Sequence, residues 1–265
     1  MVPREHGAWG LLLVPLLTGA AVGVASAHRV WPLVLFTAAA LALFWLRTPV
    51  ESLLGTTPIK TQTPAERRYV LIATILLAAV SVGCLVGLLW KGRYWQLLIL
   101  GGIAALAFVA QAIVKRLGRK ARMAAQLVGA MGLTCTAAAA YYVATGHLDK
   151  RAFELWAANW IFAGNQIHFV QLRIHAAHAA SFREKLAQRQ AFFVAQFLLL
   201  PFLAVASHWQ LMPALVMVAF LPVLARGIYW FFRGPQPLQI KSLGWSEMKQ
   251  GVLFGILLAG AFILS

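Results

Sequence analysis

Acidic side chains are scarce in this chain of 265 residues, which has 7 Asp and Glu against 23 Lys and Arg. None of them lies in the middle of a long apolar stretch. Carriers that are coupled to protons or sodium usually place a carboxylate inside the membrane as a relay. The scarcity therefore argues against a coupled transporter, although histidine can substitute. It also removes the carboxylate clusters that hold hard divalent cations.

The chain lacks the short motifs of several enzyme classes as well. Its 2 cysteines, Cys84 and Cys135, have no CxxC partner, so neither a disulfide framework nor a zinc site is expected. There is no Walker A motif, no GxSxG and no HExxH. These absences exclude the nucleotidases, hydrolases and zinc peptidases that depend on those motifs, and they leave open whether the protein is an enzyme at all.

Charged residues make up only 11% of the chain and apolar residues 61%, with a mean hydropathy of +0.77. Soluble domains have about 25% charged and about 45–50% apolar residues, so this composition indicates a membrane protein. The net charge of +16 would suit a nucleic-acid binder, but the charges lie in short segments between apolar stretches. Nucleic acid is therefore not an expected partner.

Long apolar stretches fill the chain, and a helix needs about 20 residues to cross a bilayer. We predict an all-α polytopic transmembrane bundle of nine helices that forms a single integral membrane domain over residues 1–265. Pro49 is expected to end the second helix. The predicted spans are 8–27, 30–46, 69–89, 94–114, 123–144, 152–178, 191–206, 211–230 and 250–264.

The basic residues fall almost entirely on alternate loops between these spans. Cytoplasmic loops carry the excess of Lys and Arg. The alternation therefore predicts an N-terminus inside, a C-terminus outside, and a multi-pass protein of the cytoplasmic (inner) membrane. The basic residues assigned to the inner side are Arg4, Arg47, Lys60, Arg67, Arg68, Lys115, Arg116, Arg119, Lys120, Arg122, Arg173, Arg183, Lys185, Arg189, Arg226, Arg233, Lys241 and Lys249.

The span 152–178 is the richest in polar residues. His168, Gln171, His175 and His178 share one helical face, and a second stripe contains Asn159, Gln166 and Arg173 at a spacing of seven. A helix that is polar on two sides cannot face lipid broadly, so this helix should lie centrally in the bundle. The first stripe has three interpretations: hydrogen bonds between helices, a wall that binds an anionic substrate, or ligands for a haem or a metal.

Polar and small residues also gather near the inner ends of other spans. The N-terminal segment Pro3-Arg4-Glu5-His6-Gly7-Ala8-Trp9-Gly10 is either a membrane anchor or a cover for a cavity, with Gly7 and Gly10 allowing close helix approach. Arg47 stands at the rim of the second span, where it contacts either lipid headgroups or a substrate. Gln126 lies beside Gly129 and Gly132, and such small residues predict tight helix packing.

The N-terminal motif Pro3–Gly10, Arg47-Thr48-Pro49, the small residues of 129–140 and the polar helix 165–173 resemble the YwiC-like family of bacterial integral membrane proteins. That family has no established activity to carry over. More distantly, nine spans with an inside N-terminus look like the UbiA-type intramembrane prenyltransferases. Those enzymes hold a diphosphate on Mg²⁺ through Asp-rich motifs, whereas this chain has arginine, glutamine and histidine at the corresponding places.

We therefore expect a cationic and His-lined cavity that opens to the cytoplasm and binds, or binds and modifies, an anionic lipid or isoprenoid-type substrate without an Asp-rich Mg²⁺ motif. The cofactor is unknown, no metal ligands are assigned, and membrane lipids are the expected partners. The alternatives are a non-enzymatic transporter, an assembly factor for a respiratory complex, or a His-ligated haem or metal protein. The candidate substrate-binding residues are Arg4, His6, Arg47, Gln126, Asn165, His168, Gln171, Arg173 and His175.

Overall fold

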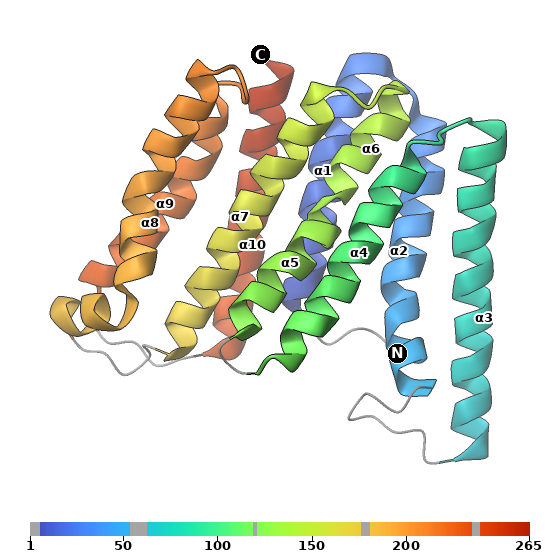
Figure 1. Cartoon of the computed structure of the whole chain (residues 1–265), viewed down its shortest axis with the longest axis horizontal. Coiled ribbons are helices and arrows are strands. Elements are labelled where there is room, and N and C mark those ends of the chain that lie inside the picture. The colour runs from blue at the N-terminus through green and yellow to red at the C-terminus, as the bar shows by residue number, and fades with distance from the viewer. Residues whose placement is uncertain (1–5, 54–62, 119–120, 176–180, 235–238) are drawn as a thin grey trace.

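The computed structural model describes residues 6–53, 63–118, 121–175, 181–234 and 239–265, and this part of the chain is helical without strands. Figure 1 shows the helices side by side, with α1, α6 and α7 in the middle and α3 and α8 towards the two sides. The elements are α1 (His6–Ala27), α2 (Val30–Leu53), α3 (Pro64–Val86), the π-helical turn η1 (Gly87–Lys91), α4 (Leu97–Arg116), α5 (Arg122–Thr134), α6 (Thr136–Thr145), α7 (Lys150–His175), α8 (Phe182–His208), α9 (Val216–Phe232) and α10 (Ile240–Ile263).

Each of the nine predicted spans corresponds to a helical crossing, because η1 continues α3, and α5 and α6 follow one another with a break at Cys135. Within the described residues, 7 of these segments are long and apolar enough to span a membrane. The other two are α9, an apolar helix of 17 residues, and the more polar α7. The predicted all-α polytopic membrane fold is confirmed.

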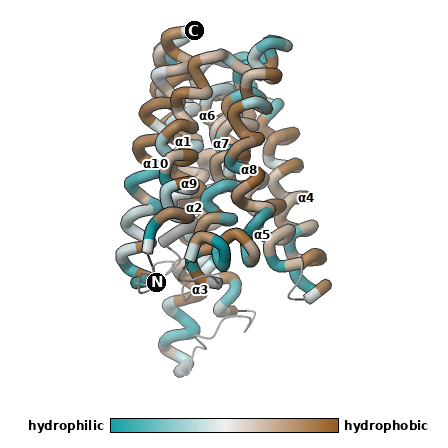
Figure 2. Tube along the Cα trace, turned by 90° about the vertical axis from the view of Figure 1, so that its left-hand side faces the viewer, coloured by the Kyte–Doolittle hydropathy of each residue, from teal (hydrophilic) through white to brown (hydrophobic). Residues whose placement is uncertain are grey.

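The helices α1 and α10 begin at the lower end of the bundle in Figure 1, and the chain finishes at the upper end. In Figure 2 hydrophilic segments are prominent near the lower end, whereas hydrophobic residues predominate along the helices. Arginines and lysines near the ends of α4 and α9, near the start of α8, and Arg173 near the end of α7 lie at this lower end, whereas Lys150 and Arg151 begin α7 at the upper end.

Close packing of small residues holds α1 against α6. A Cβ atom at Gly19 would lie 2.1 Å from the carbonyl oxygen of Ala137, and one at Gly23 would lie 2.6 Å from the Cβ atom of Ala144. The two backbones therefore approach as closely as glycine allows. The tight packing predicted for the small residues of α5 is confirmed at Gly132, where a Cβ atom would lie 3.1 Å from the Cβ atom of Ala107 in α4. At Gly10 a Cβ atom would meet nothing within 4 Å, so the close approach predicted there is not found among the described residues.

The helix α7 is central, as its two polar stripes predict, and it contacts α1, α5, α6, α8 and α9. On the second stripe, Asn159 donates to the Thr18 hydroxyl of α1 at 3.1 Å, and Gln166 donates to the Glu247 carbonyl of α10 at 3.0 Å. Arg173, the third member of that stripe, is half-buried near the lower end of the same face. The stripe thus faces protein rather than lipid.

Several helices extend beyond the predicted apolar spans at the lower end. Pro49 does not end α2, which continues to Leu53 and buries the proline. Two capping boxes start helices early, Thr63 with Glu66 for α3 and Ser181 with Glu184 for α8. In each box the hydroxyl and the glutamate satisfy amide groups that the first turn leaves free.

The largest extension belongs to α10, which begins at Ile240 although its apolar stretch was predicted to start at 250. The additional turns place Glu247 well inside a helix that is long and apolar enough to cross the membrane. The predicted span, 250–264, left Glu247 outside the helix, whereas the structure places it in the first third of α10. A search for apolar runs misses these turns because Lys241, Glu247 and Lys249 interrupt the apolar residues there.

Candidate anion-binding cavity

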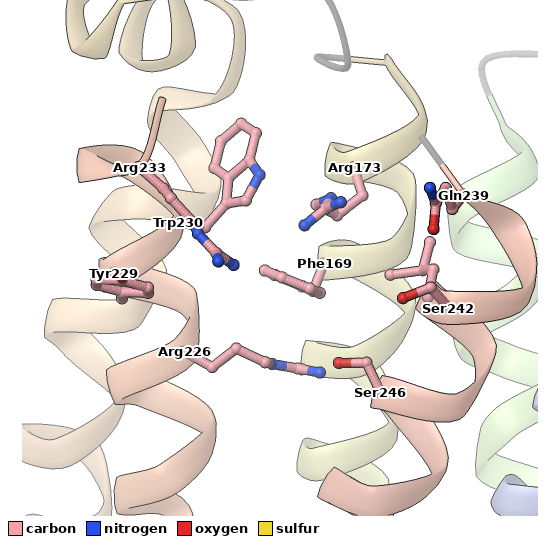
Figure 3. A pocket seen from close by; sticks show the side chains of 10 residues that line it. Phe169, Arg173, Arg226, Tyr229, Trp230, Arg233, Gln239, Ser242 and Ser246 are labelled. Atoms are coloured by element: carbon pink, nitrogen blue, oxygen red, sulfur yellow. The ribbon is translucent and has the colours of Figure 1, made fainter. Parts of the chain in front are cut away.

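A cavity of about 480 Å³ opens between α7, α9 and α10 near the lower end of the bundle. Its walls combine arginines, aromatic rings and short polar side chains (Figure 3). Of the described residues that line it, none is acidic. They are Phe169, Arg173, Arg226, Tyr229, Trp230, Arg233, Gln239, Ser242, Leu243 and Ser246.

Three arginines from two helices point into this cavity (Figure 3). Arg173 comes from α7, Arg226 comes from α9, and Arg233 is the C-cap residue that directly follows α9. Two residues seven positions apart on a helix differ in depth by about 10 Å, given the rise of 1.5 Å per residue. Arg233 therefore lies at the open end of α9, whereas Arg226 lies deeper, at the base of the cavity.

Aromatic rings hold the arginine side chains of α9. The guanidinium carbon of Arg226 lies 4.1 Å from the centre of the Phe169 ring, and that of Arg233 lies 5.6 Å from the centre of the Tyr229 ring. A cation over a ring face is attracted by its quadrupole. In Figure 3 the Phe169 ring lies between Arg173 and Arg226, so it separates two like charges that both face the cavity.

Arg226 forms an ion pair with Glu247 of α10, whose Oε1 accepts from Nη1 at 2.5 Å. Both side chains are well buried, with exposed fractions of 12% and 11%. The other two guanidinium nitrogens of Arg226, Nε and Nη2, are buried without a hydrogen-bond partner, and so is Oε2 of Glu247. Buried polar atoms without partners are costly, so this base of the cavity has donors that an additional acceptor would satisfy.

Like charges lie close together at the cavity. Arg233 and Arg226 both act on Arg173 as neighbouring like charges, and Glu247 opposes them. Repulsion among partly desolvated cations is unfavourable unless an anion lies between them.

The N-terminus of α10 adds positive potential to the same cavity. Its N-cap residue, Gln239, makes no side-chain capping hydrogen bond, and Ser242 follows in the first turn. The first amide groups of a helix are free donors at the positive end of its dipole. The cavity thus has guanidinium groups on two walls and a helix N-terminus with hydroxyl groups on the third.

A buried lysine on α8 holds the wall that α9 forms. Lys185 is 2% exposed, and its Nζ donates to the carbonyl oxygen of Trp230 at 3.1 Å and also to that of Arg233. Its Nζ lies 4.6 Å from the centre of the Trp230 ring. A cation at a helix C-terminus satisfies carbonyl groups that have no partner within the helix. Lys185 therefore caps the C-terminus of α9 and fixes the backbone of Arg233.

The cavity lined by Arg173, Arg226 and Arg233 is called the arginine cavity below. Of the predicted site residues whose side chains the structure describes, only Arg173 lines it. Asn165 and His168 line a second hollow of about 230 Å³ between α5, α7 and α8, where Asn165 donates to Gln196 at 3.2 Å and the His168 ring packs against Phe192. Apart from Asn165, His168 and Gln196, the residues that line this hollow are apolar or glycine.

The remaining predicted residues lie elsewhere. Gln171 donates to Gln126 at 3.2 Å, which joins α7 to α5. Arg47 pairs with Glu51 on the surface of α2 at 2.7 Å. Arg4 and the side chains of His6 and His175 lie outside the described residues. The described part of the chain has no group of three His, Cys, Asp or Glu that could hold a metal ion.

The comparison with known families identifies the chain. The model of the family described as YwiC-like protein matches residues 2–142, which is more than half of the 265 residues. The chain belongs to the YwiC-like family. Neither the curated proteins nor the solved structures give a match.

In this YwiC-like protein the family match includes Arg47 and the small residues of α5 and α6, and it ends before α7. The arginine cavity therefore lies beyond the matched residues. The sequence interpretation missed Arg226, Arg233 and Ser246 because it treated the two arginines as loop charges and began the last span too late. Their spacing of seven on α9, equal to that of Gln166 and Arg173, is the signal that would have found the two arginines.

Proposed function

We propose that this YwiC-like protein binds the anionic headgroup of a lipid or isoprenoid-type molecule in the arginine cavity. The observation that carries the proposal is the cluster of Arg173, Arg226 and Arg233 around a cavity whose deepest guanidinium has two buried nitrogens without a partner. Arginine suits phosphate because its planar fork donates two parallel hydrogen bonds. The apolar tail of the ligand would extend among the helices or into the surrounding lipid.

The proposal includes the location and the orientation of the protein. It places the chain in the bacterial cytoplasmic membrane with the lower end of the bundle facing the cytoplasm, because this end carries the basic residues. The cavity then opens toward the leaflet and the compartment in which lipid precursors carry phosphate groups. Labelling of single cysteines should find Asp149 and Ser265 outside and Arg122 inside; a cytoplasmic Ser265 would contradict this orientation.

The test of binding is native mass spectrometry of the protein purified in a mild detergent. Wild type should retain a lipid with a phosphate group, and the double variant Arg173→Gln/Arg233→Gln should lose most of it. The matched control is Arg116→Gln/Arg122→Gln, which removes two exposed arginines at the same end of the bundle. Equal retention by both double variants would show that bulk basic charge, and not the cavity, attracts the lipid.

Glu247 gives some support to a second function, transport of the anion. The argument against a coupled transporter rests on the lack of carboxylates inside spans, and Glu247 is a buried carboxylate within α10, paired with a cavity arginine. Intramembrane carboxylates of this kind are typical of proton relays. Flux of the bound anion through proteoliposomes, driven by a proton gradient, would favour transport, whereas binding without flux would favour a binding protein or an enzyme.

A further inference from the structure

We propose that the hollow between α5, α7 and α8 is a second binding site, and that it takes a single-chain lipid alcohol, an uncharged molecule with one hydroxyl group on an apolar chain. The hollow has a volume of about 230 Å³ and shares no lining residue with the arginine cavity. This second site is independent of the proposed function, because the arginines take no part in it.

The walls of the hollow carry no permanent charge. The described residues around it include neither a carboxylate nor a lysine nor an arginine. A charged headgroup there would be desolvated without a counterion, which is very unfavourable in apolar surroundings. Phe192 of the hollow packs against Phe169 of the arginine cavity, with ring centres 6.2 Å apart, so packed rings separate the two sites. The hollow therefore suits an uncharged ligand.

One buried polar atom in the hollow lacks a hydrogen-bond donor. Asn165 donates through Nδ2 to Oε1 of Gln196 at 3.2 Å, but its own Oδ1 is buried without a partner. Gln196 is 2% exposed and packs so closely on Gly227 of α9 that a Cβ atom there would lie 2.7 Å from Oε1. An unpaired buried acceptor is unfavourable. A hydroxyl group of a ligand would satisfy it.

The depth of the hollow determines where that hydroxyl group comes from. Asn165 lies in the middle third of α7, and Gln196 lies near the middle of α8. These positions are in the hydrocarbon core, where water is scarce, so the donor has to arrive on an apolar molecule. Ala195 lines the hollow and is exposed. The hollow thus reaches the lipid-facing surface of α8, and a molecule dissolved in the bilayer can enter it.

The volume limits the ligand to one chain. A cavity of about 150 Å³ with apolar walls holds one benzene ring, and the hollow is somewhat larger. It accommodates the hydroxyl end of one chain, whereas a diacylglycerol brings two chains joined at its headgroup. A hydroxyl group both donates and accepts, so it suits the unpaired oxygen of Asn165 and the imidazole of His168, which also lines the hollow.

The experiment uses a long-chain alcohol with a diazirine next to its hydroxyl end, added to proteoliposomes of the full-length protein. After irradiation, mass spectrometry should find the label on the segments of α7 and α8 that line the hollow. Excess unlabelled alcohol should suppress this labelling. The methyl ether of the same alcohol cannot donate and leaves Asn165 unpaired, so about tenfold more of it should be needed.

Three variants locate the binding. Ala195→Trp fills the mouth of the hollow and should nearly abolish the labelling. Ala204→Trp is the matched control, because Ala204 is exposed and lies nine positions further along α8, on the opposite side of the helix. It should be labelled as wild type is. Asn165→Leu removes the acceptor and should abolish the advantage of the alcohol over the ether, and a thermal unfolding curve ensures that this variant is compared as folded protein.

Equal competition by the alcohol and its ether in wild type would overturn the proposal, because the hollow would then hold any apolar chain. Equal labelling of Ala195→Trp and Ala204→Trp would overturn it as well, since the label would lie elsewhere. Linear and isoprenoid alcohols of equal carbon number are compared as competitors, and the stronger one identifies the source of the chain. Arg173→Gln/Arg233→Gln should be labelled like wild type even if the arginine cavity binds no anion; loss of labelling would contradict a separate site.

Discussion

The helices of the N-terminal and C-terminal halves of this protein pack through different kinds of side chain. In the N-terminal half, α1–α6, small residues let backbones touch, and Ala137, Ala138 and Ala140 are 0% exposed. In the C-terminal half, α7–α10, large rings such as Phe169, Phe192 and Phe231 form a separate aromatic cluster. Small residues allow two helices to pack with their backbones in contact, whereas large rings and long cationic side chains hold helices further apart. The arginine cavity therefore lies in the half of the molecule where the helices are held further apart.

The comparison also separates two kinds of polar residue. In the N-terminal half, hydroxyl groups mostly bond within their own helix, as when Thr134 donates to the carbonyl of Ala130 at 2.8 Å. In the C-terminal half, polar side chains bond between helices, as Asn165 does with Gln196 and Lys185 with Trp230. Close packing of small residues thus stabilises the N-terminal half, whereas hydrogen bonds between side chains of different helices stabilise the C-terminal half. The stability of the C-terminal half should therefore depend on its charged and polar side chains.

The largest effect should come from adding one methyl group to the tightly packed half. Gly19→Ala places a Cβ atom against the backbone carbonyl of Ala137, which cannot move away without shifting α6. Overpacking typically costs about 1–3 kcal/mol, and a collision with backbone should reach about 3 kcal/mol or more. Thermal unfolding in detergent measures the loss of stability.

Gly10→Ala is the matched control on the same helix, since a Cβ atom there meets nothing within 4 Å. It should be neutral or slightly stabilising because alanine favours the helix by up to about 1 kcal/mol. If both variants unfold at the same temperature, the close approach of α1 and α6 is not what holds the N-terminal half together.

The next largest effect should come from Lys185→Met in the other half. Methionine keeps much of the apolar stem but leaves the carbonyl groups of Trp230 and Arg233 without their charged donor. Hydrogen bonds to charged groups contribute about 1.5–3 kcal/mol each, so stability should fall by about 2–3 kcal/mol. Lys241→Met removes an exposed lysine near the cavity and should change stability little. Equal effects of the two substitutions would show that Lys185 does not cap α9.

The sequence was sufficient for the spans and for the central position of α7, because both follow from the distribution of apolar and polar residues along one helix. It also identified Arg173, which lies in the last turn of α7. The sequence could not show that Arg47 and Arg173 lie in different parts of the molecule, because the distance between α2 and α7 depends on tertiary packing. Glu247 was misjudged because polar turns extend α10 before its apolar stretch begins.

A smaller effect, on binding rather than stability, should separate the two predicted arginines. Arg173→Lys keeps the charge but loses the fork, so lipid retention should fall about tenfold while the unfolding temperature stays near that of wild type. Arg47→Ala removes an exposed pair with Glu51, and such pairs contribute about 0–1 kcal/mol. It should leave retention unchanged. Loss of lipid in Arg47→Ala would show that Arg47 on α2 contributes to lipid binding after all.

The smallest expected effect is that of removing divalent cations. Mg²⁺ requires oxygen ligands, usually carboxylates, and the described residues that line the cavity include none. Lipid retention should therefore be the same in EDTA and in millimolar Mg²⁺. Release of the lipid in EDTA and recovery with Mg²⁺ would contradict direct binding by the arginines.

Site-specific photocrosslinking tests the central claim most directly, because it asks which half of the molecule holds the headgroup. Tyr229 lines the cavity and Tyr69 is an exposed tyrosine of α3 in the N-terminal half. With a photoreactive phenylalanine analogue at either position, irradiation in membranes should attach a phosphate-containing lipid at position 229, and excess phosphate monoester should suppress this product. Equal crosslinking at positions 69 and 229, or a product at 229 that phosphate does not suppress, would contradict the assignment of the arginine cavity as the binding site.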